Sequence, residues 1–121
     1  MAKEVKDIKE RTLEFALRII KLCQYLDKNP GACRTLSGQL LKAGTSVGAN
    51  VEGAQAGQSR PDFISKNSIA LKEARECRYW LRLLIGAKIM PEKSLAELRD
   101  EAEEIKRVLG SIVERSKKQT A

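Results

Sequence analysis

The stretch TLSGQLLKAGTSVGANVEG, residues 35–53, decides the fold. Its apolar residues recur every three or four positions along one side, at Leu36, Leu40, Ala43, Val47 and Val51. This period predicts an amphipathic helix with one buried face. Gly44 and Gly48 repeat one turn apart on a neighbouring side, although a glycine costs a helix about 1 kcal/mol relative to alanine. The pair indicates either the close backbone approach of another helix or subunit, or a kinked or frayed helix.

The residues before this stretch predict a first helix over about 5–27. Its seam follows the same period, at Ile8, Thr12, Phe15, Ile19, Leu22 and Leu26. An adjoining face widens the apolar stripe, with Leu13, Ala16, Ile20 and Cys23. The helix is expected to end before Asn29-Pro30-Gly31, where three residues that disfavour helix continuation lie together.

Two more helices follow residue 53. Ser59-Arg60-Pro61-Asp62 is a start signal, in which Ser59 caps the helix and the Asp62 carboxylate complements its dipole. This helix is predicted over 60–86, with the seam Phe63, Asn67, Ala70, Ala74, Cys77, Leu81 and Leu84. Pro91, or Ser94 with Glu97, opens a last helix over 91–116, with the seam Leu95, Leu98, Ala102, Ile105, Leu109 and Ile112. The polar tail from Ser116 is expected to fray.

Four helices joined mostly by short turns, without a convincing strand, predict an all-α fold. The arrangement typical of such a pattern is an antiparallel up-and-down four-helix bundle, here one domain over 1–121.

The composition excludes several function classes. The 121 residues include no histidine, so zinc-dependent hydrolysis, histidine-assisted nucleophilic catalysis and ExxH di-metal sites lack their imidazole. The three cysteines, Cys23, Cys33 and Cys77, have no CxxC spacing, which favours free thiols in a reducing compartment. No phosphate-binding loop of the GxxxxGK type is present. We therefore predict no enzyme activity, no catalytic residue, no metal and no cofactor.

The chain begins directly with a charged amphipathic pattern and has no apolar signal core. Its longest apolar run, Leu83-Leu84-Ile85, is far too short to span a bilayer. We expect a cytoplasmic protein without a membrane partner.

The net charge of +7 comes from 23 Lys and Arg against 16 Asp and Glu, and it suits either a polyanionic partner or solubility alone. On the third predicted helix a basic stripe with one aromatic residue runs opposite the apolar seam; it consists of Lys72, Arg75, Arg78, Tyr79 and Arg82. Guanidinium groups form bidentate pairs with phosphate, and an aromatic ring stacks on an unpaired base, so the stripe is a candidate nucleic-acid site. The alternative is a solvated helix face, neutralised within the helix by Glu73 and Glu76.

The sole tryptophan, Trp80, lies between the core seam and the basic stripe. It is interpreted as a core-edge residue or, preferentially, as an anchor between copies of the chain, because aliphatic residues already fill the core. Gly44, Gly48 and Trp80 together are the predicted oligomer interface. A polar cluster at the end of the second helix, Ser46, Asn50 and Glu52 followed by Gly53, is assigned a structural role in capping and cross-linking helices.

Two stretches resemble a known bacterial family. They are Ser46-Val47-x-Ala49-Asn50-Val51-Glu52-Gly53 and Ile69-Ala70-x-Lys72-Glu73-Ala74-x-Glu76-x-x-Tyr79-Trp80-Leu81. They look like the four-helix bundle proteins encoded in intervening sequences of large-subunit ribosomal RNA genes, to which the accessory variability determinant of diversity-generating retroelements is related. The likeness covers roughly residues 8 to 113. Ser46, Asn50, Glu52, Gly53 and Glu76 match its signature.

The resemblance implies a homopentameric ring of bundles with basic surfaces. It also implies a role in nucleic-acid binding and, for the retroelement relatives, a reverse transcriptase as partner. Two functions follow as hypotheses: a non-enzymatic oligomer that binds RNA or DNA with weak sequence preference, or a protein-binding scaffold for a reverse transcriptase or another nucleic-acid enzyme.

Overall fold

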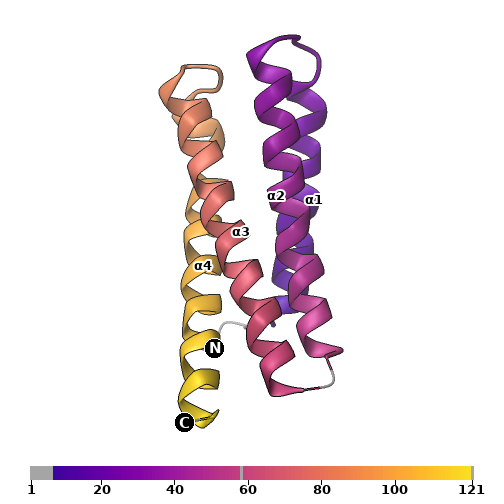
Figure 1. Ribbon diagram of the computed structural model, residues 1–121. Coiled ribbons are helices and arrows are strands. Elements are labelled where there is room, and N and C mark those ends of the chain that lie inside the picture. The colour runs from indigo at the N-terminus through magenta and orange to yellow at the C-terminus, as the bar shows by residue number, and fades with distance from the viewer. Residues whose placement is uncertain (1–6, 58, 121) are drawn as a thin grey trace, which may run out of the picture.

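The computed structural model describes residues 7–57 and 59–120, and all regular structure there is helical (Figure 1). The four helices are α1 (Ile8–Leu26), α2 (Ala32–Gln55), α3 (Arg60–Gly86) and α4 (Glu92–Thr120). Each runs antiparallel to the next and packs extensively on it, whereas α1 and α4 share only a small contact. The predicted four-helix bundle is therefore confirmed, with the α1–α4 side as its loosest seam.

An ion pair closes that loosest seam. The Nε of Arg11 on α1 donates to the Glu101 carboxylate of α4 at 2.6 Å, and its Nη2 donates to the other oxygen at 2.9 Å. This two-pronged geometry is the stronger form of an arginine–carboxylate pair, and both side chains are partly buried. It joins α1 to α4, the two neighbouring helices with the smallest contact.

The helices begin where local hydrogen bonds dictate. Asp7 and Ser59 cap α1 and α3 by accepting the backbone N–H of Glu10 at 2.9 Å and of Asp62 at 3.2 Å, the second as predicted. Before α2, Gly31 adopts a φ of 86° and its carbonyl accepts the N–H of Thr35 at 3.1 Å. This conformation suits glycine, and it starts α2 at Ala32, three residues before the predicted start.

The ends of the chain differ from the sequence analysis. The start predicted for the first helix, near Val5, lies outside the described residues, and α1 begins at Ile8. The expected fraying from Ser116 is wrong, because α4 stays helical to Thr120 and Ser116 itself is buried. An Nη1 of Arg60 on α3 also donates to the Gln119 side chain at 2.6 Å. Contact with α3 thus stabilises a segment whose composition alone favours disorder.

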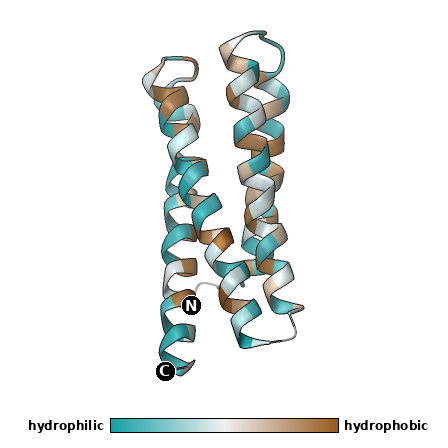
Figure 2. Ribbon diagram, in the orientation of Figure 1, coloured by the Kyte–Doolittle hydropathy of each residue, from teal (hydrophilic) through white to brown (hydrophobic). Residues whose placement is uncertain are grey.

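The seams predicted from periodicity form one core. Its largest fully buried apolar side chains come from all four helices: Phe15, Ile19, Leu26, Leu40, Leu81, Leu84, Ile105 and Leu109. Each such side chain contributes about 1.5–3 kcal/mol by leaving water, so this core is the main source of stability. Hydrophilic residues predominate on the visible side of α4 (Figure 2).

Gly44 and Gly48 bring α2 close to α1 within one chain. A Cβ atom on Gly44 would lie 2.7 Å from the Cγ2 atom of Ile19, and one on Gly48 would lie 3.3 Å from the hydroxyl of Thr12. Their spacing is explained by the approach of another helix, one of the alternatives left open by the sequence. Gly44 is buried beneath α1, so its assignment to a subunit interface loses its basis.

Replacing Gly44 with alanine is expected to destabilise the protein by about 1–3 kcal/mol, because the new methyl group overlaps the fully buried Ile19. Urea denaturation monitored by circular dichroism measures the change. The matched control is Gly38→Ala in the same helix, where no heavy atom lies within 4 Å of the added Cβ. This control should be neutral or stabilising by up to about 1 kcal/mol. Equal destabilisation by both substitutions would contradict the close-packing explanation.

Candidate nucleic-acid interface

The predicted basic stripe lies on the outer side of α3, where helical spacing of three and four residues brings its members together. Lys72, Arg75 and Arg82 are exposed, and 52% of Tyr79 is exposed. Within the part of the chain that the structure describes, no carboxylate lies within ion-pair distance of Arg75 or Arg82. The neutralising pairs with Glu73 and Glu76, which the alternative interpretation requires, are not formed. Two guanidinium groups therefore face solvent with their donors available.

Arg78 differs from the rest of the stripe. Its Nε lies 3.1 Å from the Oε1 atom of Glu103 on α4, and both side chains are partly buried. Lys106 and Arg107 also contact this carboxylate, each at 3.0 Å. The pKa of Glu103 is held below its usual value, mainly by Lys106, with Arg107 and Arg78 contributing. Arg78 thus belongs to the packing of α3 on α4, and one carboxylate is shared among three cations.

Tyr79 and Trp80 form an aromatic pair beside the stripe. Their rings meet edge to face, with centroids 5.4 Å apart. Trp80 is half-buried against the core, and its indole Nε1 is buried without a hydrogen-bond partner among the described residues. This is the core-edge position that the sequence analysis gave as one alternative for Trp80. The contact holds Tyr79 beside Trp80, while about half of the Tyr79 side chain stays exposed.

The family signature does not assemble into a single site. The Asn50 amide donates to the carbonyl of Ser46 at 2.9 Å, so it bonds within its own helix, and the predicted cross-link between helices is not formed. Gly53 serves α3 instead, because a Cβ there would lie 3.1 Å from the aliphatic chain of Lys66. Glu52 is exposed and lies near Leu13 at the start of α1. The signature residues of α2 therefore serve different contacts, and Glu76 lies on α3.

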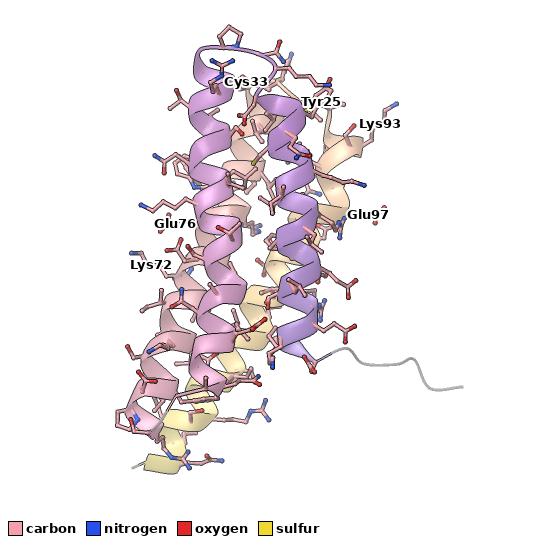
Figure 3. All side chains as sticks on the ribbon, turned by 90° about the vertical axis from the view of Figure 1, so that its right-hand side faces the viewer. Tyr25, Cys33, Lys72, Glu76, Lys93 and Glu97 are labelled. Atoms are coloured by element: carbon pink, nitrogen blue, oxygen red, sulfur yellow. The ribbon has the colours of Figure 1, made fainter. Side chains whose placement is uncertain are left out.

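Glu73 has a raised pKa, whereas the sequence analysis considered it only as a residue that neutralises the stripe. Partial burial raises its pKa first, and the neighbouring Glu76 raises it further, while Lys72 and Lys42 oppose the shift. Figure 3 shows Lys72 and Glu76 projecting from one edge of the bundle. The spacing of three residues between Glu73 and Glu76 was the available signal, because like charges at that distance repel on a helix.

The described residues contain no group of three or more His, Cys, Asp or Glu side chains arranged to hold a metal ion. Cys23 and Cys77 are buried free thiols, and burial raises the pKa of both, which disfavours the reactive thiolate. None of the helices described combines the length and apolar character needed to cross a bilayer.

Together, the bundle and its stripe define a small helical protein with a basic flank, and comparison with known proteins gives its family. The chain belongs to the 23S rRNA-intervening sequence protein family, whose model matches residues 4–111. This confirms the part of the resemblance that concerns intervening sequences.

A solved structure is also similar: the crystal structure of a protein of unknown function from the S23 ribosomal protein family of Bacteroides thetaiotaomicron. Its TM-score is 0.82 at 40% sequence identity, covering 88% of this chain and 98% of that one. No curated protein matches the chain.

The raised pKa of Glu73 predicts a pH-dependent gain from Glu73→Gln. Its ionised form costs stability above the folded-state pKa, and that cost disappears as the pH falls through this pKa. The variant should therefore melt at a higher temperature than the wild type at neutral pH, and the two melting temperatures should converge at about pH 4. Calorimetry across this range tests it, with the exposed Glu97→Gln of α4 as control. A gain that persists unchanged at low pH would refute the assignment.

Proposed function

We propose that the protein is a non-enzymatic homo-oligomer that binds RNA or DNA with weak sequence preference through the α3 stripe. The observation that carries the proposal is the pair of exposed arginines, Arg75 and Arg82, which lack carboxylate partners in the described structure and flank the exposed ring of Tyr79. The family description, which refers to intervening sequences of 23S rRNA, supports a connection with nucleic acid.

The spacing of these groups suits a single strand or an irregular RNA. Arg82 follows Arg75 by seven positions, a distance of about 10 Å along the helix, and Tyr79 lies between them. The two guanidinium groups contact successive parts of a phosphate backbone, while the ring stacks on an unpaired base. These contacts depend on the charge and shape of the strand, so base identity contributes little to the affinity.

Assembly is proposed through the outer side of the α1–α2 pair. There Leu13 and Leu17 of α1 are 52% and 56% exposed, and Leu41 of α2 is 37% exposed. The sequence analysis placed Leu13 on a widened apolar face; there Cys23 is buried and Ala16 and Ile20 are half-buried, whereas Leu13 stays exposed. A second copy covers these side chains, and a closed ring of five copies, as the resemblance implies, multiplies weak stripes into one polyvalent surface.

Leu17→Glu is expected to dissociate the oligomer without unfolding the bundle, because the side chain lies outside the core. Light scattering coupled to size exclusion should show assemblies for the wild type and 13.5 kDa monomers for the variant. Tyr25→Glu is the matched control, since Tyr25 is 54% exposed on another side of α1. A wild type that is monomeric at every concentration tested would rule out this part of the proposal.

Replacing Arg75 and Arg82 together with glutamine is expected to weaken binding to all sequences alike and to reduce the dependence of affinity on salt. Each phosphate contact contributes about 0.7–0.9 to the slope of log affinity against log salt, so losing two contacts per stripe lowers the slope by about 1.5. Fluorescence anisotropy with labelled single- and double-stranded RNA and DNA at several salt concentrations measures this slope. Tyr79→Ala should affect unpaired strands more than duplexes.

Glu103→Gln should have the opposite effect to the arginine variants. This change removes the carboxylate that pairs with Arg78, so Arg78 becomes available to a phosphate and nucleic-acid binding should strengthen. Lys93→Gln is a control for the loss of a single surface charge, because Lys93 is exposed near the start of α4, away from the stripe. If the stripe variants bind as the wild type does, the site lies elsewhere.

A protein-binding scaffold, with a reverse transcriptase or another nucleic-acid enzyme as partner, is the second candidate. The exposed Leu13, Leu17 and Leu41 favour it, because the same apolar side chains can seat a different protein. Absence of nucleic-acid binding at low salt, together with a monomeric wild type, selects this candidate.

A further inference from the structure

A second candidate site lies at the end of the bundle where α2 ends, α3 begins and α4 ends. An open hollow of about 780 Å³ lies there, called the end hollow below. Its lining includes Phe63, Ile112, Ser116, Arg60, Arg115 and Gln119. The volume falls within the range of small-molecule pockets in proteins.

The end hollow exists because the helices differ in length. α1 has 19 residues whereas α4 has 29, and α1 begins short of the end that the other three helices reach, as Figures 1 and 3 both show. In the described structure three helices therefore surround the last layer of the core. Phe63 and Ile112 remain half-buried at this end of the bundle and give the hollow an apolar wall.

The end hollow is also strongly basic. Two arginines line it, and none of its described lining residues is acidic. Arg60 is held in place by its 2.6 Å hydrogen bond to Gln119, and Arg115 makes only a long 3.5 Å bond to the carbonyl of Ser111 in its own helix. The nearby Asp62 does not line the hollow, and its carboxylate pairs with Lys66 at 2.8 Å. The two guanidinium charges are therefore not neutralised by the surrounding described residues.

A hydroxyl adds a neutral hydrogen-bonding group to the wall of the end hollow. Ser116 is only 8% exposed and lines the end hollow, yet its hydroxyl has no hydrogen-bond partner among the described residues. The hydroxyl is not among the fully enclosed polar atoms of the described residues, so it is accessible from the hollow, where a ligand can supply a hydrogen-bond partner. The first turn of α3 adds the positive end of a helix dipole beside Arg60.

We infer that the end hollow binds a nucleotide, with its terminal phosphate between Arg60 and Arg115 and its base against Phe63. The two guanidinium groups and the Ser116 hydroxyl match phosphate oxygens. A bare phosphate leaves most of the volume empty, whereas an attached nucleoside fills it and covers the apolar wall. The nucleotide comes either from a free mononucleotide or from the phosphorylated end of a strand.

The end hollow is separate from the α3 stripe. Arg75 follows Arg60 by fifteen positions of helix, a distance of about 22 Å. The inference extends the proposed function to strand ends, but it does not depend on the stripe, so each is testable without the other.

Calorimetric titration at physiological salt compares three probes: adenosine 5′-monophosphate, a short single strand with a 5′-phosphate, and the same strand with a 5′-hydroxyl. The wild type should bind the phosphorylated strand about tenfold more tightly than the hydroxyl strand. Arg115→Gln and Ser116→Ala should each reduce this ratio towards one while the melting temperature stays close to that of the wild type. Lys118→Gln removes a charge from the same end of α4, outside the hollow, and should leave the ratio unchanged.

The monophosphate distinguishes the two sources. If it binds alone and Arg115→Gln abolishes that binding, the site takes free nucleotides, whereas a preference confined to the strand assigns the site to strand ends. The stripe variant Arg75→Gln with Arg82→Gln should keep the phosphate preference even where overall strand affinity falls, which separates this inference from the proposed function. Equal affinity for both strands together with no binding of the monophosphate, or an unchanged ratio in Arg115→Gln, would overturn it.

Discussion

The rest of the structure depends on the close contact between α1 and α2 at Gly44 and Ile19. With no side chain on Gly44, α1 lies against α2 and makes only a small contact with α4. The four helices therefore do not share their surfaces evenly. The outer side of the α1–α2 pair keeps exposed leucines, and the α3–α4 pair carries the basic stripe on its own outer side. One packing constraint thereby leaves two chemically different flanks on one small bundle.

The charged residues divide into two groups by their contacts. Arg11 and Arg78 each pair with a carboxylate of α4. Arg11 joins α1 to α4 through Glu101, and Arg78 joins α3 to α4 through Glu103. Arg75, Arg82 and Arg115 have no carboxylate partner in the described structure. The net charge of the chain counts all of these alike, but only the second group retains its full capacity for an external anion. Contacts therefore indicate binding capacity better than net charge does.

Periodicity in the sequence was sufficient for the helices and for most of the core. Leu40, Leu81 and Ile105 were placed in seams by spacing alone and are fully buried, because a helix with one apolar stripe can bury it in few ways. The Ser59 cap was equally predictable, since its hydrogen bond is local. Effects between helices were not predictable. The order of Ser116 and Gln119 depends on α3, more than fifty positions earlier in the chain, and the partner of Gly44 depends on the register between two helices.

The candidate sites show the same division. The stripe was predictable because its members are neighbours on one helix. The ion pair that Arg78 forms with Glu103 was not, because Glu103 lies on α4. The end hollow has no signal in the sequence, since its walls come from three helices and its presence depends on their unequal lengths. For Asn50 the sequence analysis predicted a cross-link between helices, but its amide bonds only within its own helix.

The position of Trp80 makes the protein its own spectroscopic reporter. This sole tryptophan forms an edge-to-face pair with Tyr79, and it lies twenty positions along the helix from Arg60, or roughly 30 Å. Indole emission depends on the immediate surroundings of the ring, and here the surroundings include the aromatic residue of the stripe. A ligand on the stripe therefore alters the intrinsic fluorescence, whereas a ligand at the far end of α3 leaves it unchanged, so an unlabelled chain distinguishes occupancy of its two basic regions by light alone.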